Sequence, residues 1–285
     1  MRKKFWKSLK KQITRIIKFV TFLVFLTSGL HFAEEVKKPK PSTGLSLQTG
    51  FLGSYSPLDL VTESYETYSK DAKADPRFSD TSSIPKSYFG GAFLDMFYQF
   101  NPILFAGGGL EFSLQFPSGM DFYRAGLNET YHIDYLLNTY SAKFNAGILF
   151  LRSANWYLLG FVSLRFALGT FTFEESTEGE NFAQKRTSLT GATSFGYGFS
   201  VSTQAVYRLS PKTGILLGIR GGFLNFSQWS GKDPLGNPIK LYLASGASGN
   251  RLIFLKDGEN PPGDEKETSL VYLDFALYFG VHQQL

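Results

Sequence analysis

The chain has 285 residues, a formal net charge of +5 at pH 7 and no cysteine, and 16% of its residues are aromatic. The lack of cysteine excludes a disulfide scaffold, a thiolate metal site and a lipid-modified cysteine. With 43% hydrophobic residues, the composition is neither that of a disordered chain nor that of a collagen-like one. An excess of positive charge is typical of nucleic-acid binding, but here it comes from one end of the chain.

Residues 1–33 hold eight basic side chains and no acidic one, so removing them changes the net charge from +5 to −3. The basic start is followed by the apolar stretch Phe19 to Leu26 and by small residues that lead to Ala33, which is the layout of a secretory signal peptide. We expect cleavage after Ala33, a periplasmic linker over residues 34–43 and one domain over residues 44–285. A retained anchor is the alternative, although the apolar run is shorter than the roughly 20 residues of a spanning helix.

The rest of the chain alternates between apolar runs and turn-rich breaks. The eight runs are Gly44 to Ser56, Tyr88 to Phe100, Ile103 to Phe116, Tyr135 to Phe150, Trp156 to Phe173, Ser188 to Arg208, Gly214 to Phe226 and Ser269 to His282. Each is longer than the ~9–11 residues with which a tilted strand crosses a bilayer. No window after the first 33 residues has 18 consecutive apolar residues, so any membrane crossing is expected to use strands.

The breaks between the runs alternate in length. The tight ones are Asn101-Pro102, Arg152 to Asn155 and Ser210 to Thr213, and the long polar ones are Pro57 to Ser87, Pro117 to Asp134, Glu174 to Thr187 and Ser227 to Thr268. Short periplasmic turns and long extracellular loops are typical of outer-membrane barrels. The sequence therefore predicts an all-β fold: a closed antiparallel eight-stranded transmembrane β-barrel with up-and-down connections.

The last long break contains two further short apolar runs, Ile239 to Ala244 and Arg251 to Leu255. They are too short to span a bilayer, so we expect a hairpin that projects beyond the membrane. Two extra strands of a ten-stranded barrel are the alternative. The segment Glu174 to Glu180 contains four glutamates and is expected to be an acidic loop.

Hydrophobicity within the runs alternates with a period of two. In the last run, Phe275, Leu277 and Phe279 share one face, and Asp274 and Tyr278 share the other. This is the pattern of a strand whose two faces meet lipid and a polar lumen. The second and fifth runs are less regular, because Phe93, Phe97, Leu159 and Phe161 share faces with charged residues, so part of the lumen is expected to be apolar.

Aromatic residues collect near the ends of the runs, as in the interfacial girdles of membrane proteins. The expected girdle residues are Tyr55, Tyr88, Tyr98, Phe100, Trp156, Tyr157, Tyr207 and Trp229.

Six charged residues lie within the runs, away from their ends, on the faces assigned to the lumen. They are Asp95, Glu111, Lys143, Arg165, Arg220 and Asp274, and their charges sum to zero. A charge facing lipid at the midplane costs ~2–4 kcal/mol, which favours the lumen. A four-residue turn at Arg152 to Asn155 would set Phe150 opposite Leu158, and therefore Lys143 opposite Arg165.

Two ion pairs are expected first in this network: Glu111 with Lys143, and Arg220 with Asp274. Three roles remain open for it: a salt-bridged plug that closes the lumen, a gated narrow pore, and an apolar small-molecule passage past Phe93, Phe97 and Phe161.

These features together resemble the eight-stranded outer-membrane barrels that include the OmpA transmembrane domain and the OmpX, OmpW and opacity-type proteins. The resemblance covers Gly44 to Leu285 and rests on architecture rather than on a motif. It implies a comparable lumenal charge network and location in the outer membrane. It also implies lipid and lipopolysaccharide as surroundings, the barrel-assembly machinery during insertion, and a monomer. The chain ends in His282-Gln283-Gln284-Leu285, whereas such barrels usually end in an aromatic residue.

The role expected from these observations is membrane integrity and surface display. Limited, porin-like permeability is a possible addition. Long loops on a rigid barrel are suited to a host or environmental ligand. Some barrels of this group look like lipid A modifying enzymes, and His132 with Asp134 would be the candidates here. No serine is selected as their nucleophile, so we expect no catalytic residues and no enzyme. We also expect no metal site, no cofactor and no nucleic-acid partner.

Overall fold

The computed structural model describes residues 44–124, 126, 128–179, 182–233, 235–246, 248–256, 266–267 and 269–285. The predicted signal peptide (1–33) and linker (34–43) lie outside the described residues. Among the described residues, no helix is long and apolar enough to cross a membrane.

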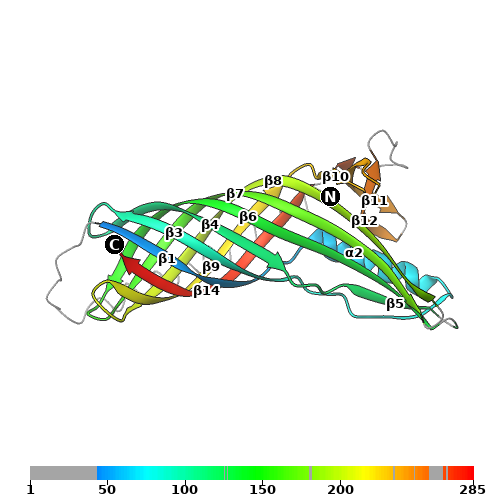
Figure 1. The fold of residues 1–285 in the computed structure, drawn as a ribbon, viewed down its shortest axis with the longest axis horizontal. Helices are drawn as coiled ribbons and strands as arrows, with labels where there is room; N and C mark the ends of the chain where they lie inside the picture. Colours follow the sequence, from blue (N-terminus) through cyan, green and yellow to red (C-terminus); the bar gives the residue numbers. More distant parts are fainter. Residues whose placement is uncertain are drawn as a thin grey trace.

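Eight antiparallel strands close into a hydrogen-bonded ring (Figure 1). In order around the ring they are β1 (Gly44–Tyr55), β3 (Tyr88–Gln99), β4 (Leu104–Gln115), β6 (Glu129–Arg152), β7 (Trp156–Gly179), β8 (Phe182–Arg208), β9 (Thr213–Phe226) and β14 (Leu270–Gln284). Each corresponds to one of the eight predicted runs, and β14 pairs with β1 to close the ring. The two short runs of the last break are not members, so the ring has eight strands rather than ten.

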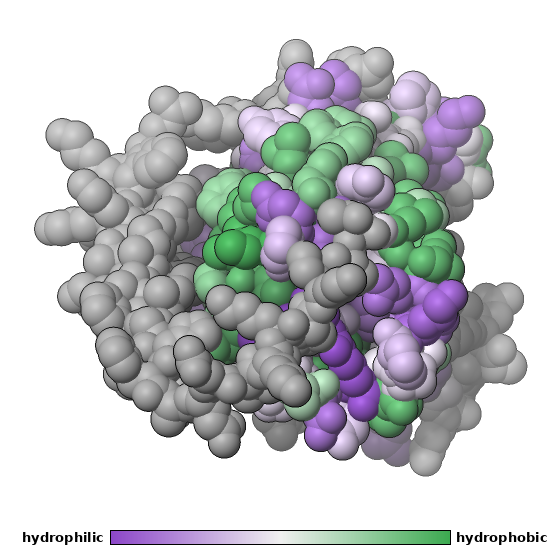
Figure 2. Space-filling view, turned by 90° about the vertical axis from the view of Figure 1, so that its left-hand side faces the viewer, coloured by the Kyte–Doolittle hydropathy of each residue, from purple (hydrophilic) through white to green (hydrophobic). Residues whose placement is uncertain are grey.

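The two faces of the ring differ as the alternation predicts. Large apolar side chains point outward, and Phe51, Phe144 and Leu277 are 73%, 63% and 65% exposed. On the alternate positions of the same strands, small polar and charged side chains are buried in the interior. Figure 2, viewed from the end with the tight turns, shows hydrophobic and hydrophilic residues side by side at the surface.

Two expected girdle residues are buried instead. Tyr157 points into the ring, where the guanidinium of Arg208 lies 5.3 Å from its ring centroid. Trp229 follows β9 and folds inward, with its ring against those of Phe171 and Phe226. Six other expected girdle residues are exposed: Tyr55, Tyr88, Tyr98, Phe100, Trp156 and Tyr207.

The predicted register of β6 and β7 holds except near the turn. Lys143 faces Arg165, as expected. Phe150 does not face Leu158, because a bulge pairs Leu149 with Leu159 and Leu151 with Leu158. The bulge lets the Phe150 ring lie over Gly160, where any Cβ would overlap it.

One side of the ring extends far beyond the rest (Figure 1). Strands β6, β7 and β8 have 24, 24 and 27 residues, whereas β4 has 12 and its pairing with β6 ends at Ser113 and Thr139. The segment Glu174 to Glu180 was expected to be a loop, but it is the end of β7 up to Gly179. Pairing with both β6 and β8 continues the strand through these charged residues.

The other three long breaks form a small folded unit against this extension, which we call the cap. It comprises the helix α2 (Asp59–Ala74) and the strands β2 (Phe78–Thr81), β5 (Met120–Arg124), β10 (Ser230–Lys232), β11 (Pro238–Gly246), β12 (Gly249–Lys256) and β13 (Lys266–Glu267). The expected hairpin is confirmed as β11 and β12, and β10 joins it to β8. The segment of α2 was expected to be a polar loop, and among the described residues the fold is all-β apart from this helix.

Candidate functional site

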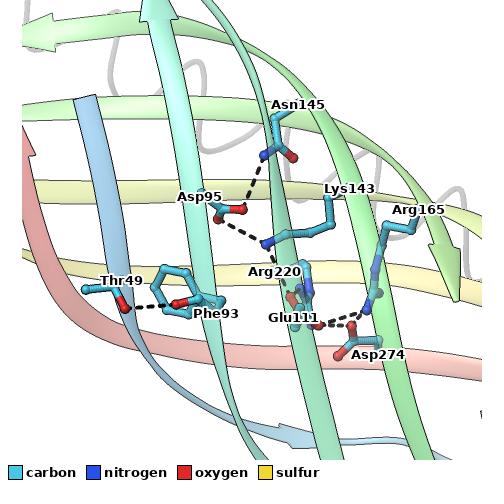
Figure 3. Close-up of polar contacts among 9 residues, drawn as sticks. All are labelled: Thr49, Phe93, Asp95, Glu111, Lys143, Asn145, Arg165, Arg220 and Asp274. Atoms are coloured by element: carbon cyan, nitrogen blue, oxygen red, sulfur yellow. Dashed lines mark hydrogen bonds and ion pairs between the residues drawn. The ribbon is translucent and has the colours of Figure 1, made fainter. Parts of the chain in front are cut away.

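The six predicted interior charges meet in one buried cluster, which we call the ionic belt (Figure 3). Its members come from six different strands of the ring: Asp95 on β3, Glu111 on β4, Lys143 on β6, Arg165 on β7, Arg220 on β9 and Asp274 on β14. All six are buried, and both Arg165 and Asp274 have an exposed fraction of 0%. Because the strands surround the interior, the ion pairs cross the ring from wall to wall.

Glu111 is the centre of the belt and contacts all three bases. Its carboxylate oxygens lie 3.3 Å from the Lys143 Nζ, 2.9 Å from the Arg165 Nη2 and 2.8 Å from the Arg220 Nη2. The pair of Glu111 with Lys143 is one of the two expected from the sequence. A carboxylate that accepts from three cationic donors satisfies most of its lone pairs without water.

The two aspartates complete the charge balance. Asp95 accepts from the Lys143 Nζ at 3.0 Å and from the Asn145 Nδ2 at 3.5 Å. Asp274 accepts from the Arg165 Nη1 at 2.7 Å and also pairs with Arg220, which is the second expected pair. Each base therefore contacts two acids. Full pairing is what buried ions require.

Strand register explains how like charges are tolerated here. Lys143 and Arg165 face each other directly, and the repulsion between them is offset by the carboxylate of Glu111, which binds both. On β4, Gly109 faces Asp95, and a Cβ at Gly109 would overlap the Asp95 carboxylate. Glycine at this position therefore lets the acid lie across the strand toward Lys143.

Aromatic clusters lie on both sides of the belt. On the side of the tight turns, the rings of Phe97 and Phe161 are 4.7 Å apart and pack with Phe93 and Leu159. The expected apolar part of the lumen is thus present. On the other side, Tyr272 packs edge-on against Phe89 at 5.0 Å. The cluster there continues through Phe171, Phe226 and Trp229 into the cap. The belt is therefore enclosed by apolar side chains along the axis of the ring.

The cap is held to the ring extension by α2. The Tyr65 hydroxyl donates to the Asp134 Oδ1 at 3.3 Å and accepts from the Tyr135 backbone N–H at 3.0 Å. The Ser64 hydroxyl lies 2.9 Å from the Tyr135 hydroxyl and accepts from the Leu252 backbone N–H on β12 at 3.2 Å. One turn of the helix therefore connects β6 to β12.

Burial affects ionisation at this contact. Asp134 lies beyond the eight-strand part of the ring, and removal from water raises the pKa of its carboxyl. The pKa of the Tyr65 hydroxyl is also raised, first by burial and then by the nearby charge of Asp134. The neutral Tyr65 hydroxyl is thus kept as a hydrogen-bond donor.

The two residues weighed for catalysis, His132 and Asp134, both lie on β6 and have different partners. His132 lies on the ring extension with its Nδ1 2.7 Å from the Asp121 Oδ1 on β5, and Asp134 accepts from Tyr65 instead. Among the described residues, no group of three potential metal ligands occurs.

Sequence reasoning predicted the hairpin of the cap but missed α2 and its polar contacts with β6. A signal was present: Val61, Tyr65, Tyr68 and Ala72 recur at the spacing of a helix face, and they are the residues that α2 turns toward the cluster.

Comparison with known proteins gives similarities of structure alone. No family model and no curated protein matches the chain. It is similar to the outer membrane protein OprG from Pseudomonas aeruginosa, with 10% identity, a TM-score of 0.37, and coverage of 86% of this chain and 97% of that one. Neisserial surface protein A (NspA) has 14% identity, a TM-score of 0.34 and coverage of 85% and 98%. Ail, the attachment invasion locus protein of Yersinia pestis, has 12% identity, a TM-score of 0.28 and coverage of 84% and 99%.

Proposed function

We propose that this chain is a bacterial outer-membrane β-barrel protein with a structural and surface-display role, whose lumen is closed by the ionic belt. The observation that carries the proposal is the combination of a closed ring with an apolar outside and a paired, buried ionic interior. A soluble protein hides its apolar face, whereas this ring exposes Phe51, Leu110, Phe195, Leu217 and Leu277, each more than 60%. Lipid is the solvent that such a surface requires.

The two ends of the ring support an orientation. The connections at one end are the tight turns after β3, β6 and β8, and the cap lies at the other end. In outer-membrane barrels the short turns are periplasmic and the long connections are extracellular. We therefore place the cap on the cell surface, carried by the rigid strands β6, β7 and β8. Lipopolysaccharide would surround it, and a ligand from the host or the environment is its proposed partner.

A small cavity beside the belt supports the proposed closure of the lumen. The cavity next to Asp95, Lys143 and Arg220 has a volume of about 10 Å³, roughly the space of one water molecule. Moving an ion through it would require several of the belt's ion pairs to separate at once. A plug therefore fits these contacts better than a narrow pore or a passage for small hydrophobic molecules, because the rings of Phe97 and Phe161 are in contact there.

The proposed role is non-catalytic and monomeric, with insertion by the barrel-assembly machinery. Its test begins with membrane fractionation of an expressing didermic bacterium and gel mobility with and without heating. We expect the protein in the outer-membrane fraction and a faster, compact band in the unheated sample. A soluble fraction with one heat-independent band would contradict the proposal. Loss of a lipid A mass shift in His132→Ala would contradict the non-catalytic part.

A further inference from the structure

The end of the ring with the tight turns contains a second set of basic groups outside the ionic belt, in which Arg152 and Arg208 are half-buried and His282 is buried. A pocket there is lined by side chains from both halves of the ring, among them Arg152, Arg208, His282, Tyr157 and Gln284. Neither arginine belongs to the six charges predicted from the sequence. Both lie at strand ends, where a charge is usually a solvated one.

Strand register places the two arginines on the strands that flank Tyr157. Arg152 on β6 faces Tyr157 on β7 directly, and the Arg208 guanidinium on β8 lies 5.3 Å from the centroid of the Tyr157 ring. Both arginines line the same pocket. A planar guanidinium held over an aromatic ring loses little freedom when it binds an anion.

The opposite wall of the pocket adds further nitrogen donors. His282 on β14 packs edge-on against Tyr157 with the ring centroids 5.7 Å apart, and its Nδ1 lies 3.4 Å from the Gln48 Nε2. His282 and Arg208 line the same pocket. Three nitrogen-bearing groups therefore converge on one space from β6, β8 and β14.

No acidic residue in the pocket lining offsets the charges of Arg152 and Arg208. The pocket lining contains no aspartate or glutamate, and among the described residues neither Arg152 nor Arg208 has an ion pair. The Arg152 Nε is buried without a hydrogen-bond partner in the described part of the chain. In the ionic belt, by contrast, every base contacts two acids. Two half-buried arginines without an acidic partner leave hydrogen-bond donors that an anion in the pocket can use.

We propose that this pocket binds a phosphate group, with Arg152 and Arg208 as its two charged ligands. Arginine matches phosphate because its planar fork donates two parallel hydrogen bonds to neighbouring oxygens. In the orientation proposed above, the pocket opens toward the periplasm. Free phosphate compounds and the headgroups of the inner leaflet are the two sources of this chemistry.

The test uses the refolded full-length protein in zwitterionic detergent and inorganic phosphate as the probe. Binding is measured as broadening and shift of the phosphate 31P NMR signal during titration in constant chloride. We expect saturable binding by the wild type. We expect Arg152→Gln and Arg208→Gln each to weaken it roughly tenfold or more, since each removes charge-assisted hydrogen bonds.

The matched control is Arg77→Gln, which removes the same charge from an exposed site where Arg77 pairs with Asp75. Its affinity should equal that of the wild type, and the unheated gel mobility of each variant verifies that the ring is folded. The proposal would be overturned by a lack of saturable binding to the wild type. It would also be overturned by equal binding to the wild type and to the double variant Arg152→Gln/Arg208→Gln. Displacement of the bound phosphate by short-chain phosphatidylglycerol, but not by an equal amount of an anionic detergent without phosphate, would assign the site to a lipid headgroup. Equal effects of the two additives would assign it to free phosphate.

Discussion

Replacing Glu111 by glutamine removes the centre of the ionic belt while keeping the size of the side chain. Lys143, Arg165 and Arg220 then share only Asp95 and Asp274, so three buried positive charges face two negative ones. Removing one partner of a buried ion pair costs ~3–5 kcal/mol. We expect the free energy of unfolding to fall by about that amount, because Glu111 is buried and contacts all three bases.

The assay is urea unfolding of the refolded protein in lipid vesicles, followed by tryptophan fluorescence and by unheated gel mobility. Glu178→Gln is the control, since Glu178 lies near the far end of β7, outside the belt. The double variant Glu111→Gln/Arg220→Gln restores two acids against two bases and should recover part of the lost stability. A Glu111→Gln variant as stable as Glu178→Gln would refute the reasoning. So would a double variant that shows the full sum of both single losses.

Three further predictions concern single contacts. Gly109→Ala should lower the free energy of unfolding by ~1–3 kcal/mol, because its Cβ would displace the Asp95 carboxylate. Gly53→Ala is its control, since a Cβ there meets nothing within 4 Å, and equal urea midpoints of the two variants would contradict the prediction. Tyr65→Phe should raise amide exchange in α2 but not in β9, because it removes the hydroxyl that bonds Asp134 and Tyr135; unchanged exchange in α2 would count against this contact. Burial raises the pKa of Asp134, so the folded state binds its proton more tightly than the unfolded state does. The contribution of this group to stability should therefore fall as the pH rises from its ordinary value of 3.8 through the raised one. In the Asp134→Asn variant, the protection of the α2 amides from exchange should no longer fall over this pH range. An equal fall in the wild type and the variant would show that Asp134 is not its source.

The strands and the belt were predictable because each depends on local rules. Strict alternation fixes which face of a strand is buried, and the register across a tight turn follows from counting residues. Lys143 opposite Arg165 follows from these two rules, and alternation alone places Glu111 and Lys143 in the interior of neighbouring strands. The bulge at Phe150 did not follow, because it depends on how one ring packs over Gly160.

Helix α2 and the pocket lined by Arg152 and Arg208 were missed for a different reason. α2 has mixed polarity, and its stability comes from packing against β6 and β12, which are distant in sequence. Arg152 and Arg208 lie at strand ends, where alternation no longer tells inward from outward. Trp229 and Tyr157 were assigned to a girdle on the same weak basis. Trp229 is buried because the chain turns inward after β9. Tyr157 is buried because its place in the alternation along β7 turns its ring into the interior.

The central claim is a membrane-spanning ring whose interior is closed by the ionic belt. Single-channel recording tests it most directly, using protein reconstituted into planar bilayers from vesicles in which insertion is verified by protection of the ring from trypsin. If the lumen is closed, we expect a current equal to that of the bare lipid, without stable unitary steps. Stable steps from the wild-type protein would contradict a closed lumen and favour the narrow pore.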